Sequence, residues 1–292
     1  MNRIKGILYA AVSSSTFGLA PFFSITLLLA GFSAFEVLSY RWGVASIVLI
    51  VFGWLSGCNF RLAGKDWGVV FLLSLLRAVT SFSLIIAYQN IASGVASTIH
   101  FMYPLAVALA MMFFFREKKS LLVILAVLMS LLGAALLSLG ELEAKSGNTM
   151  VGLVAACVSV FSYAGYIVGV RTTRAVQINS TALTCYVMGL GTIFYLIGAY
   201  CTSGLQLVSD GYTWLIILGL ALPATAISNI TLVQAIKYAG PTLTSILGAM
   251  EPLTAVVIGV FVFKELFTVN SAVGIILILL AVNIVVFRRQ KS

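Results

Sequence analysis

Charged side chains are scarce in this sequence, and their scarcity decides the class of protein. Lys, Arg, Asp and Glu together make up only 9% of the 292 residues, whereas 61% are hydrophobic. Soluble domains average about 25% charged and 45–50% apolar residues, so an ordinary water-soluble fold is excluded. The apolar residues instead form stretches of about 20, the length that an α-helix needs to span a bilayer. In a membrane β-barrel, each strand is about 10 residues long and its apolar and polar residues alternate. We therefore expect an all-α membrane protein.

Residues that hold metals or carry catalytic chemistry are also few. The four cysteines, Cys58, Cys157, Cys185 and Cys201, have no CxxC or metal-ligand spacing, and His100 is the single histidine. The sequence contains no GxxxxGK[ST], HExxH or GxSxG motif. These absences argue against ATP coupling within the chain and against an intramembrane enzyme. We expect no metal, no cofactor and no catalytic residue.

Ten apolar segments are each long enough to form one membrane-spanning helix. The first follows only Arg3 and Lys5 and has no evident small-residue cleavage site, so it is interpreted as a retained helix rather than a signal peptide. The ten segments are Ile7 to Ala30, Phe35 to Leu55, Trp67 to Tyr88, Ala92 to Phe115, Leu121 to Leu139, Val151 to Val170, Thr181 to Tyr200, Tyr212 to Ile236, Thr242 to Phe263 and Val269 to Phe287.

The net charge of +9 is distributed in a way that favours a membrane topology over nucleic-acid binding. With ten spans, the basic residues outside the spans fall on one side, except Lys145 and Lys264. By the positive-inside rule both termini are then cytoplasmic. The basic side faces the anionic inner leaflet of the bilayer. We expect a multi-pass protein of the cytoplasmic (inner) membrane with no nucleic-acid partner.

Two segments of the chain match each other at one constant offset. They are "ASGVASTIHFMYPLAVALAMMFFFREKKS", from Ala92, and "GPTLTSILGAMEPLTAVVIGVFVFKELFT", from Gly240. The alignment places Pro104 opposite Pro252. Because proline lacks the N–H that continues a helix, both prolines are predicted helix interruptions.

The match divides the chain into two halves, residues 1–140 and 150–292. A weaker similarity links the first and sixth segments, so each half is predicted to hold five spans. Five is an odd number, and the second copy would therefore enter the membrane in the opposite orientation. Inverted repeats with interrupted helices near the midplane are typical of secondary transporters.

Several short motifs accompany this two-fold organisation. An arginine lies early in the second segment ("LSYRW"), a "P...FFFRE" run ends the fourth, and an "EPLTA...VFKE" run ends the ninth. The combination resembles the EamA-type members of the drug/metabolite transporter superfamily, over essentially the whole chain. The resemblance implies alternating access in a basket of paired helices, and often export of amino acids or related metabolites. It does not fix the substrate.

Four ionisable residues lie well inside predicted spans: Arg41, Arg77, His100 and Glu251. At about 1.5 Å per residue, Arg77 and Glu251 both lie roughly 14–15 Å from the cytoplasmic ends of their helices, near the midplane. One interpretation is a buried ion pair that joins the halves. The other is a zwitterion site, in which Arg77 binds a substrate carboxylate and Glu251 an ammonium group. In either case Glu251 can also carry a coupling proton.

His100 and Arg41 are expected nearer the outer face, roughly 21–22 Å from the cytoplasmic ends. His100 is interpreted mainly as a hydrogen-bonded packing residue, with a proton relay as the alternative. Tyr103 lies three residues later on the same helix face and aligns with Glu251 in the repeat, so we expect it to point inward. Arg41 is expected to snorkel toward the outer interface and Glu36, with a gating or structural role.

The predicted substrate-binding or coupling site thus consists of Arg77, Glu251, His100 and Tyr103. The leading interpretation is a secondary transporter that exports a small amino-acid-like metabolite by alternating access. A proton-coupled exporter of cationic drugs is the alternative, and Arg77 at the depth of Glu251 disfavours it. An intramembrane enzyme is the least favoured. Small-residue stripes on the first and sixth segments permit close helix contact within one chain or in a homodimer.

Overall fold

The computed structural model of the chain describes residues 2–91, 93–117, 121–138, 147–202, 204–254 and 268–288. Within these ranges the chain forms helices joined by turns and short loops, and none of these residues is in a strand. The expected all-helical class is confirmed for this part of the chain.

The helices follow the apolar segments of the sequence closely. The first half contains α1 (Asn2–Phe17), α2 (Ala20–Leu29), α3 (Ala34–Leu55), η1 (Gly64–Asp66), α4 (Trp67–Asn90), α5 (Ser93–His100), α6 (Tyr103–Phe113) and α7 (Leu121–Ser138). The second half contains α8 (Thr149–Thr172), η3 (Arg174–Gln177), α9 (Ser180–Cys201), α10 (Gly211–Ala221), η4 (Leu222–Ile227), α11 (Ser228–Ala239), α12 (Pro241–Leu247) and α14 (Val269–Arg288).

Seven helical segments of the described chain are long and apolar enough to cross a membrane. Two further apolar helices, Leu121–Gly133 and Ala272–Ile284, are shorter. The predicted span from Thr242 to Phe263 lies outside the described residues from position 255 onward. A multi-pass membrane protein is therefore confirmed, whereas the number of ten spans stays a prediction.

Three of the predicted spans are interrupted near a proline. The first breaks between α1 and α2, where Pro21 lies in the first turn of α2. The fourth breaks between α5 and α6, and Pro104 occupies the first turn of α6. The ninth breaks after α12 and is helical again from Met250, two residues before Pro252. Proline suits a first helical turn because its missing N–H has no intrahelical acceptor there.

The eighth predicted span is continuous but not uniformly α-helical. Its middle section, η4, is a π-helix that contains Pro223 and links α10 to α11. Thr225 of η4 donates its hydroxyl to the carbonyl of Leu220, five residues earlier, at 2.7 Å. Such wide turns are rare, and they are frequently found at functional sites.

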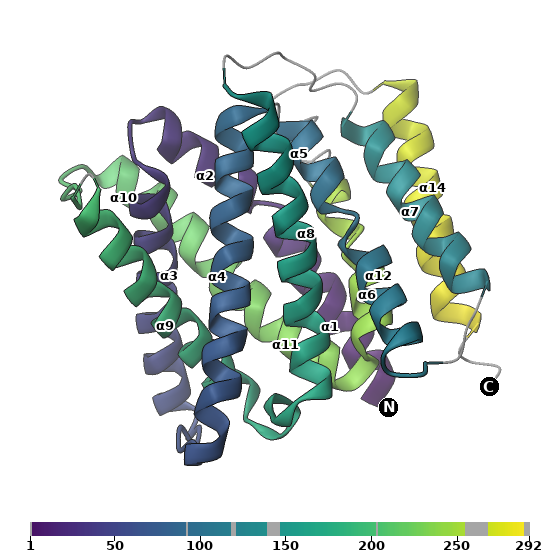
Figure 1. Cartoon of the computed structure of the whole chain (residues 1–292), viewed down its shortest axis with the longest axis horizontal. Coiled ribbons are helices and arrows are strands. Elements are labelled where there is room, and N and C mark those ends of the chain that lie inside the picture. Colours follow the sequence, from purple (N-terminus) through teal and green to yellow (C-terminus); the bar gives the residue numbers. More distant parts are fainter. Residues whose placement is uncertain are drawn as a thin grey trace.

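The main helix contacts pair the first half of the chain with the second. α4 packs along α8, α7 along α14, α1 along α11, α3 along α9, and α6 against α12. In Figure 1 the α7 and α14 pair forms one edge of the bundle. Figure 1 also places the start of α1 and the end of α14 at the same end of the bundle. The pairing is the one expected of two interlocked copies, and the inverted orientation and the domain division stay predictions.

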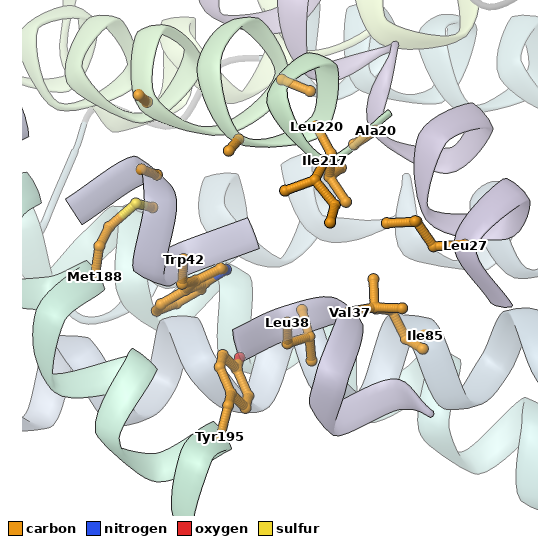
Figure 2. Close-up of a cluster of buried hydrophobic side chains, with 14 of the residues drawn as sticks. Ala20, Leu27, Val37, Leu38, Trp42, Ile85, Met188, Tyr195, Ile217 and Leu220 are labelled. Carbon is orange, nitrogen blue, oxygen red and sulfur yellow. The ribbon is translucent and has the colours of Figure 1, made fainter. Parts of the chain in front are cut away.

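One apolar cluster fixes α3 against α9 and positions the pocket described below. Trp42 is fully buried, and its ring meets Tyr195 edge-on with centroids 5.2 Å apart. Figure 2 shows Trp42 between Met188 and Tyr195, with Leu38 on the same helix. A side chain at Gly191 would overlap the Trp42 ring, so only glycine admits this packing. Small residues allow such close contact between membrane helices.

Candidate functional site

Arg77 lies deep in the bundle and is held by neutral partners. It is 1% exposed; its Nε donates to Asn229 Oδ1 at 3.0 Å, and its Nη1 donates weakly to Ser81 Oγ at 3.5 Å. The Asn229 side chain is fixed in turn, because its amide donates to the Thr225 carbonyl at 2.7 Å. Arg77 on α4 is thus oriented by the start of α11.

Three aromatic rings surround the Arg77 guanidinium. Its Cζ lies 4.9 Å from the centre of the Tyr163 ring, 5.4 Å from that of Phe17 and 5.9 Å from that of Tyr166. Cation–π contacts of this kind are worth about 2 kcal/mol or more when they are shielded from water. The rings offset part of the loss of hydration that burial imposes on this cation.

Arg41 is the second buried cation of this region. It is 4% exposed, and its Nε donates to the Thr225 hydroxyl at 2.6 Å. Its Cζ lies 5.5 Å from the centre of the Phe17 ring, the same ring that Arg77 contacts. Its Nη2 is buried and has no hydrogen-bond partner. One Phe17 ring therefore lies beside two guanidinium groups.

The prediction that Arg41 snorkels toward Glu36 is wrong. The Glu36 carboxylate instead accepts from the Ser33 amide at 2.8 Å, which caps α3, and from the Gln206 amide at 2.7 Å. With Trp42 locked against α9, the rotation of α3 turns Arg41 toward η4 and the bundle interior. The local sequence could not reveal this rotation, because tertiary packing sets it.

A pocket opens beside both arginines. A water-sized sphere can occupy about 20 Å³ of it, and none of its lining residues is acidic. Its walls combine cations and hydroxyl groups with an apolar surface. The lining residues are Phe17, Ala20, Pro21, Ser24, Arg41, Arg77, Thr80, Ser81, Leu84, Ile85 and Tyr88.

His100 ends α5 beside the same aromatic cluster. Its Nδ1 lies 2.9 Å from the Ser159 hydroxyl, and its ring stacks on Tyr163 with centroids 5.4 Å apart. It is 2% exposed, and its Nε2 has no hydrogen-bond partner. This arrangement is typical of a hydrogen-bonded packing residue, and the proton relay stays an untested alternative.

Tyr103 points inward from the start of α6. It is 2% exposed, and its ring meets that of Tyr163 with centroids 4.6 Å apart. A side chain on Gly248 would overlap the Tyr103 hydroxyl. The interruption of the fourth span thus packs directly against that of the ninth.

Glu251 is buried beside the interruption of the first span. It is 6% exposed, and a Cβ on Gly18 would lie 2.7 Å from its carbonyl oxygen. Within the described part of the chain, Glu251 and Arg77 form no direct ion pair, since the arginine donates to Asn229 and Ser81. In this conformation the Glu251 carboxylate interacts with Arg77 only electrostatically and not through a hydrogen bond, and its role stays a prediction.

The structure thus brings Arg77, His100 and Tyr103 together around Tyr163. Sequence reasoning missed Asn229, a polar residue inside an apolar segment whose presence was a usable signal. It also missed three other residues of the site, because phenylalanine, serine and threonine are common in membrane spans and their presence does not indicate a site. These residues are Phe17, Ser159 and Thr225. Among the described residues no group of three or more His, Cys, Asp and Glu side chains could hold a metal ion.

Comparison with known proteins identifies the family. The model of the EamA-like transporter family matches residues 4–139 and 150–287. An uncharacterized transporter of Archaeoglobus fulgidus is 28% identical over 238 residues, which cover 80% of this chain and 83% of that protein. A crystal structure described only as that of a protein matches 100% of this chain and 99% of its own, with a TM-score of 0.81. At 18% identity that match shows the fold alone. The chain therefore belongs to the EamA-like transporter family and is a multi-pass membrane transporter.

Proposed function

We propose that this protein is a secondary-active transporter that exports amino acids or related small metabolites across the inner membrane by alternating access. The observation that carries the proposal is the buried Arg77 guanidinium, which lines a pocket while its hydrogen-bond partners in the protein are neutral. Charged residues within membrane spans are rare, and most of them serve a function.

Arg77 is suited to bind a substrate carboxylate. Its Nε is committed to Asn229 and its Nη1 makes only a long contact with Ser81, so its outer nitrogens retain donor capacity. A guanidinium presents paired N–H groups that match the two oxygens of a carboxylate. The Tyr163 and Phe17 rings limit the orientations of the Arg77 guanidinium before the substrate binds.

The interrupted helices supply places at which the two halves can move relative to each other. The breaks at Gly18, Tyr103 and Gly248 lie where elements of the two halves meet. Short half-helices of this kind are common at transporter substrate sites. We propose that repacking at these contacts alternates access to the pocket, with both termini cytoplasmic.

Glu251 supports a second candidate function, a proton-coupled exporter of cationic drugs. Such an exporter needs a carboxylate that is free to exchange a proton for a cationic substrate. Glu251 is buried and not directly paired with Arg77, which meets that requirement. The two functions differ in the charge of the substrate, so a panel of probes separates them.

The test is flux into proteoliposomes that contain the full chain, with labelled amino acids, related organic acids and cationic dyes as probes. We expect wild type to move a carboxylate-bearing probe and Arg77→Gln to lose at least tenfold of that flux. Lys65→Gln, which removes an exposed cation, is the matched control and should keep wild-type flux. Flux of cationic probes alone would favour the second function, and equal carboxylate flux in Arg77→Gln would exclude Arg77 as the binding residue.

A further inference from the structure

Arg41 and Arg77 form a pair of like charges in one buried place. They are 4% and 1% exposed, and both line the same pocket. Their Cζ atoms lie 5.5 and 5.4 Å from the centre of the same Phe17 ring. The two like charges repel each other, and in a medium of low dielectric constant the repulsion is weakly screened.

No described carboxylate forms a direct ion pair with either arginine, although the buried Glu251 lies near enough to Arg77 to interact with it electrostatically. Arg41 donates to the Thr225 hydroxyl and Arg77 to Asn229 and Ser81, which are all neutral. The Nη2 of Arg41 is buried without a partner. A buried donor without an acceptor destabilises the fold, more so when it is charged. An anion that enters the pocket would satisfy that donor and reduce the repulsion between the two cations.

The remaining pocket walls favour an organic anion and disfavour a zwitterion. Leu84 and Ile85 offer an apolar surface, and Ser24 and Thr80 offer hydroxyl groups. No lining residue is acidic, and Glu251 is not among them. A substrate ammonium group in the pocket would therefore meet two cations and no carboxylate among the lining residues. The space in the pocket that a water-sized sphere can occupy is about 20 Å³ in this conformation, close to that of one water molecule, so binding of an organic anion requires the pocket to widen.

We propose that Arg41 and Arg77 bind the same carboxylate of the substrate, so that the pocket selects organic acids of net negative charge over zwitterions with the same skeleton. This inference rests on the proposed transport function and narrows its substrate class. It makes Arg41 a substrate-binding residue in addition to Arg77. It also makes export electrogenic, because each turnover moves negative charge outward. A membrane potential that is negative inside then drives export.

The experiment uses pairs of probes that differ in the ammonium group. Proteoliposomes with the full chain are assayed with pyruvate and alanine, 4-methyl-2-oxopentanoate and leucine, and phenylpyruvate and phenylalanine. We expect at least one oxo acid to be taken up with an apparent affinity at least tenfold higher than that of its amino acid. An inside-positive potential, set with potassium and valinomycin, should accelerate that uptake.

Variants then separate binding from folding. Arg41→Gln should weaken the apparent affinity for the oxo acid at least tenfold while changing that for the amino acid little. The apparent affinity of Arg41→Lys for the oxo acid should lie between those of wild type and Arg41→Gln, because lysine keeps the positive charge but lacks the paired N–H groups of a guanidinium. Lys65→Gln is again the control for lost cationic charge. The selectivity of wild type needs no variant, so the inference stays testable even if Arg41→Gln fails to fold.

The outcomes distinguish this inference from the transport function on which it rests. If amino acids are moved as well as or better than their oxo acids, the inference is overturned and the transport function stands. The inference is also overturned if the rate of oxo-acid uptake does not depend on the membrane potential, or if Arg41→Gln keeps the wild-type selectivity for the oxo acid over the amino acid. If wild type moves none of the carboxylate probes, the proposed function fails as well.

Discussion

The contact between Tyr103 and Gly248 permits a quantitative test of how closely the two interrupted helices fit. A methyl group on Gly248 would overlap the Tyr103 hydroxyl, and it would lie 2.9 Å from Tyr103 Cζ and 2.8 Å from the Ser245 carbonyl oxygen. Adding a methyl group to a filled interior costs about 1–3 kcal/mol of unfolding free energy. We expect Gly248→Ala to fall in the upper part of that range, because the Ser245 backbone cannot rotate away as a side chain can.

A double-mutant cycle isolates the tyrosine from the backbone contribution. Tyr103→Phe removes the overlapping oxygen, so Gly248→Ala should cost less in that background, with a coupling energy of about 1 kcal/mol. The assay is reversible unfolding of the four proteins in mixed micelles, followed by circular dichroism. Gly189→Ala is the matched control, since a Cβ there meets no atom within 4 Å. Additive effects, or a Gly248→Ala protein as stable as the control, would refute the proposed steric contact.

Three further predictions concern other parts of the molecule. Glu251→Gln should fold normally and reduce the dependence of flux on an imposed pH gradient, and an unchanged pH profile would remove the proton-carrying role. The Asp210 carboxylate accepts from the Thr213 amide at 2.7 Å, which lowers the pKa of that carboxyl below its ordinary value. The hydrogen bond by which Asp210 caps α10 should therefore persist at neutral pH and be lost as the pH falls through that lowered pKa. Amide exchange of the first turn of α10, compared between wild type and Asp210→Asn, checks this. Gly191→Ala should cost about 1–3 kcal/mol because its methyl group overlaps the Trp42 ring, and a wild-type unfolding midpoint would contradict that packing.

The fold class and most helix bounds could be predicted from the sequence, because span length follows from hydrophobicity alone. The predicted span from Trp67 to Tyr88, for example, corresponds to α4, Trp67–Asn90. The break between α1 and α2 was not predicted, although Pro21 lies in that segment. Membrane helices tolerate proline when neighbouring groups satisfy the freed carbonyls, so a proline alone does not specify a break.

The candidate site was predictable only in part. Ionisable residues inside apolar segments stand out in a sequence, which identified Arg77, Arg41 and Glu251 as residues of interest. Their hydrogen-bond partners depend on the rotation of each helix about its axis, and packing between distant segments sets that rotation. The inward turn of Arg41 and the bond from Arg77 to Asn229 both arise in this way. Neither follows from residue spacing.

The π-helical turn of η4 links the two buried cations mechanically. Thr225 accepts from Arg41 with its hydroxyl, and with its carbonyl it fixes the Asn229 amide that orients Arg77. A single residue in one wide turn is therefore hydrogen-bonded to Arg41 directly and to Arg77 through Asn229. A rearrangement of this turn would therefore alter hydrogen bonds of both arginines at once, and the environment of one buried cation depends on the same backbone segment as that of the other.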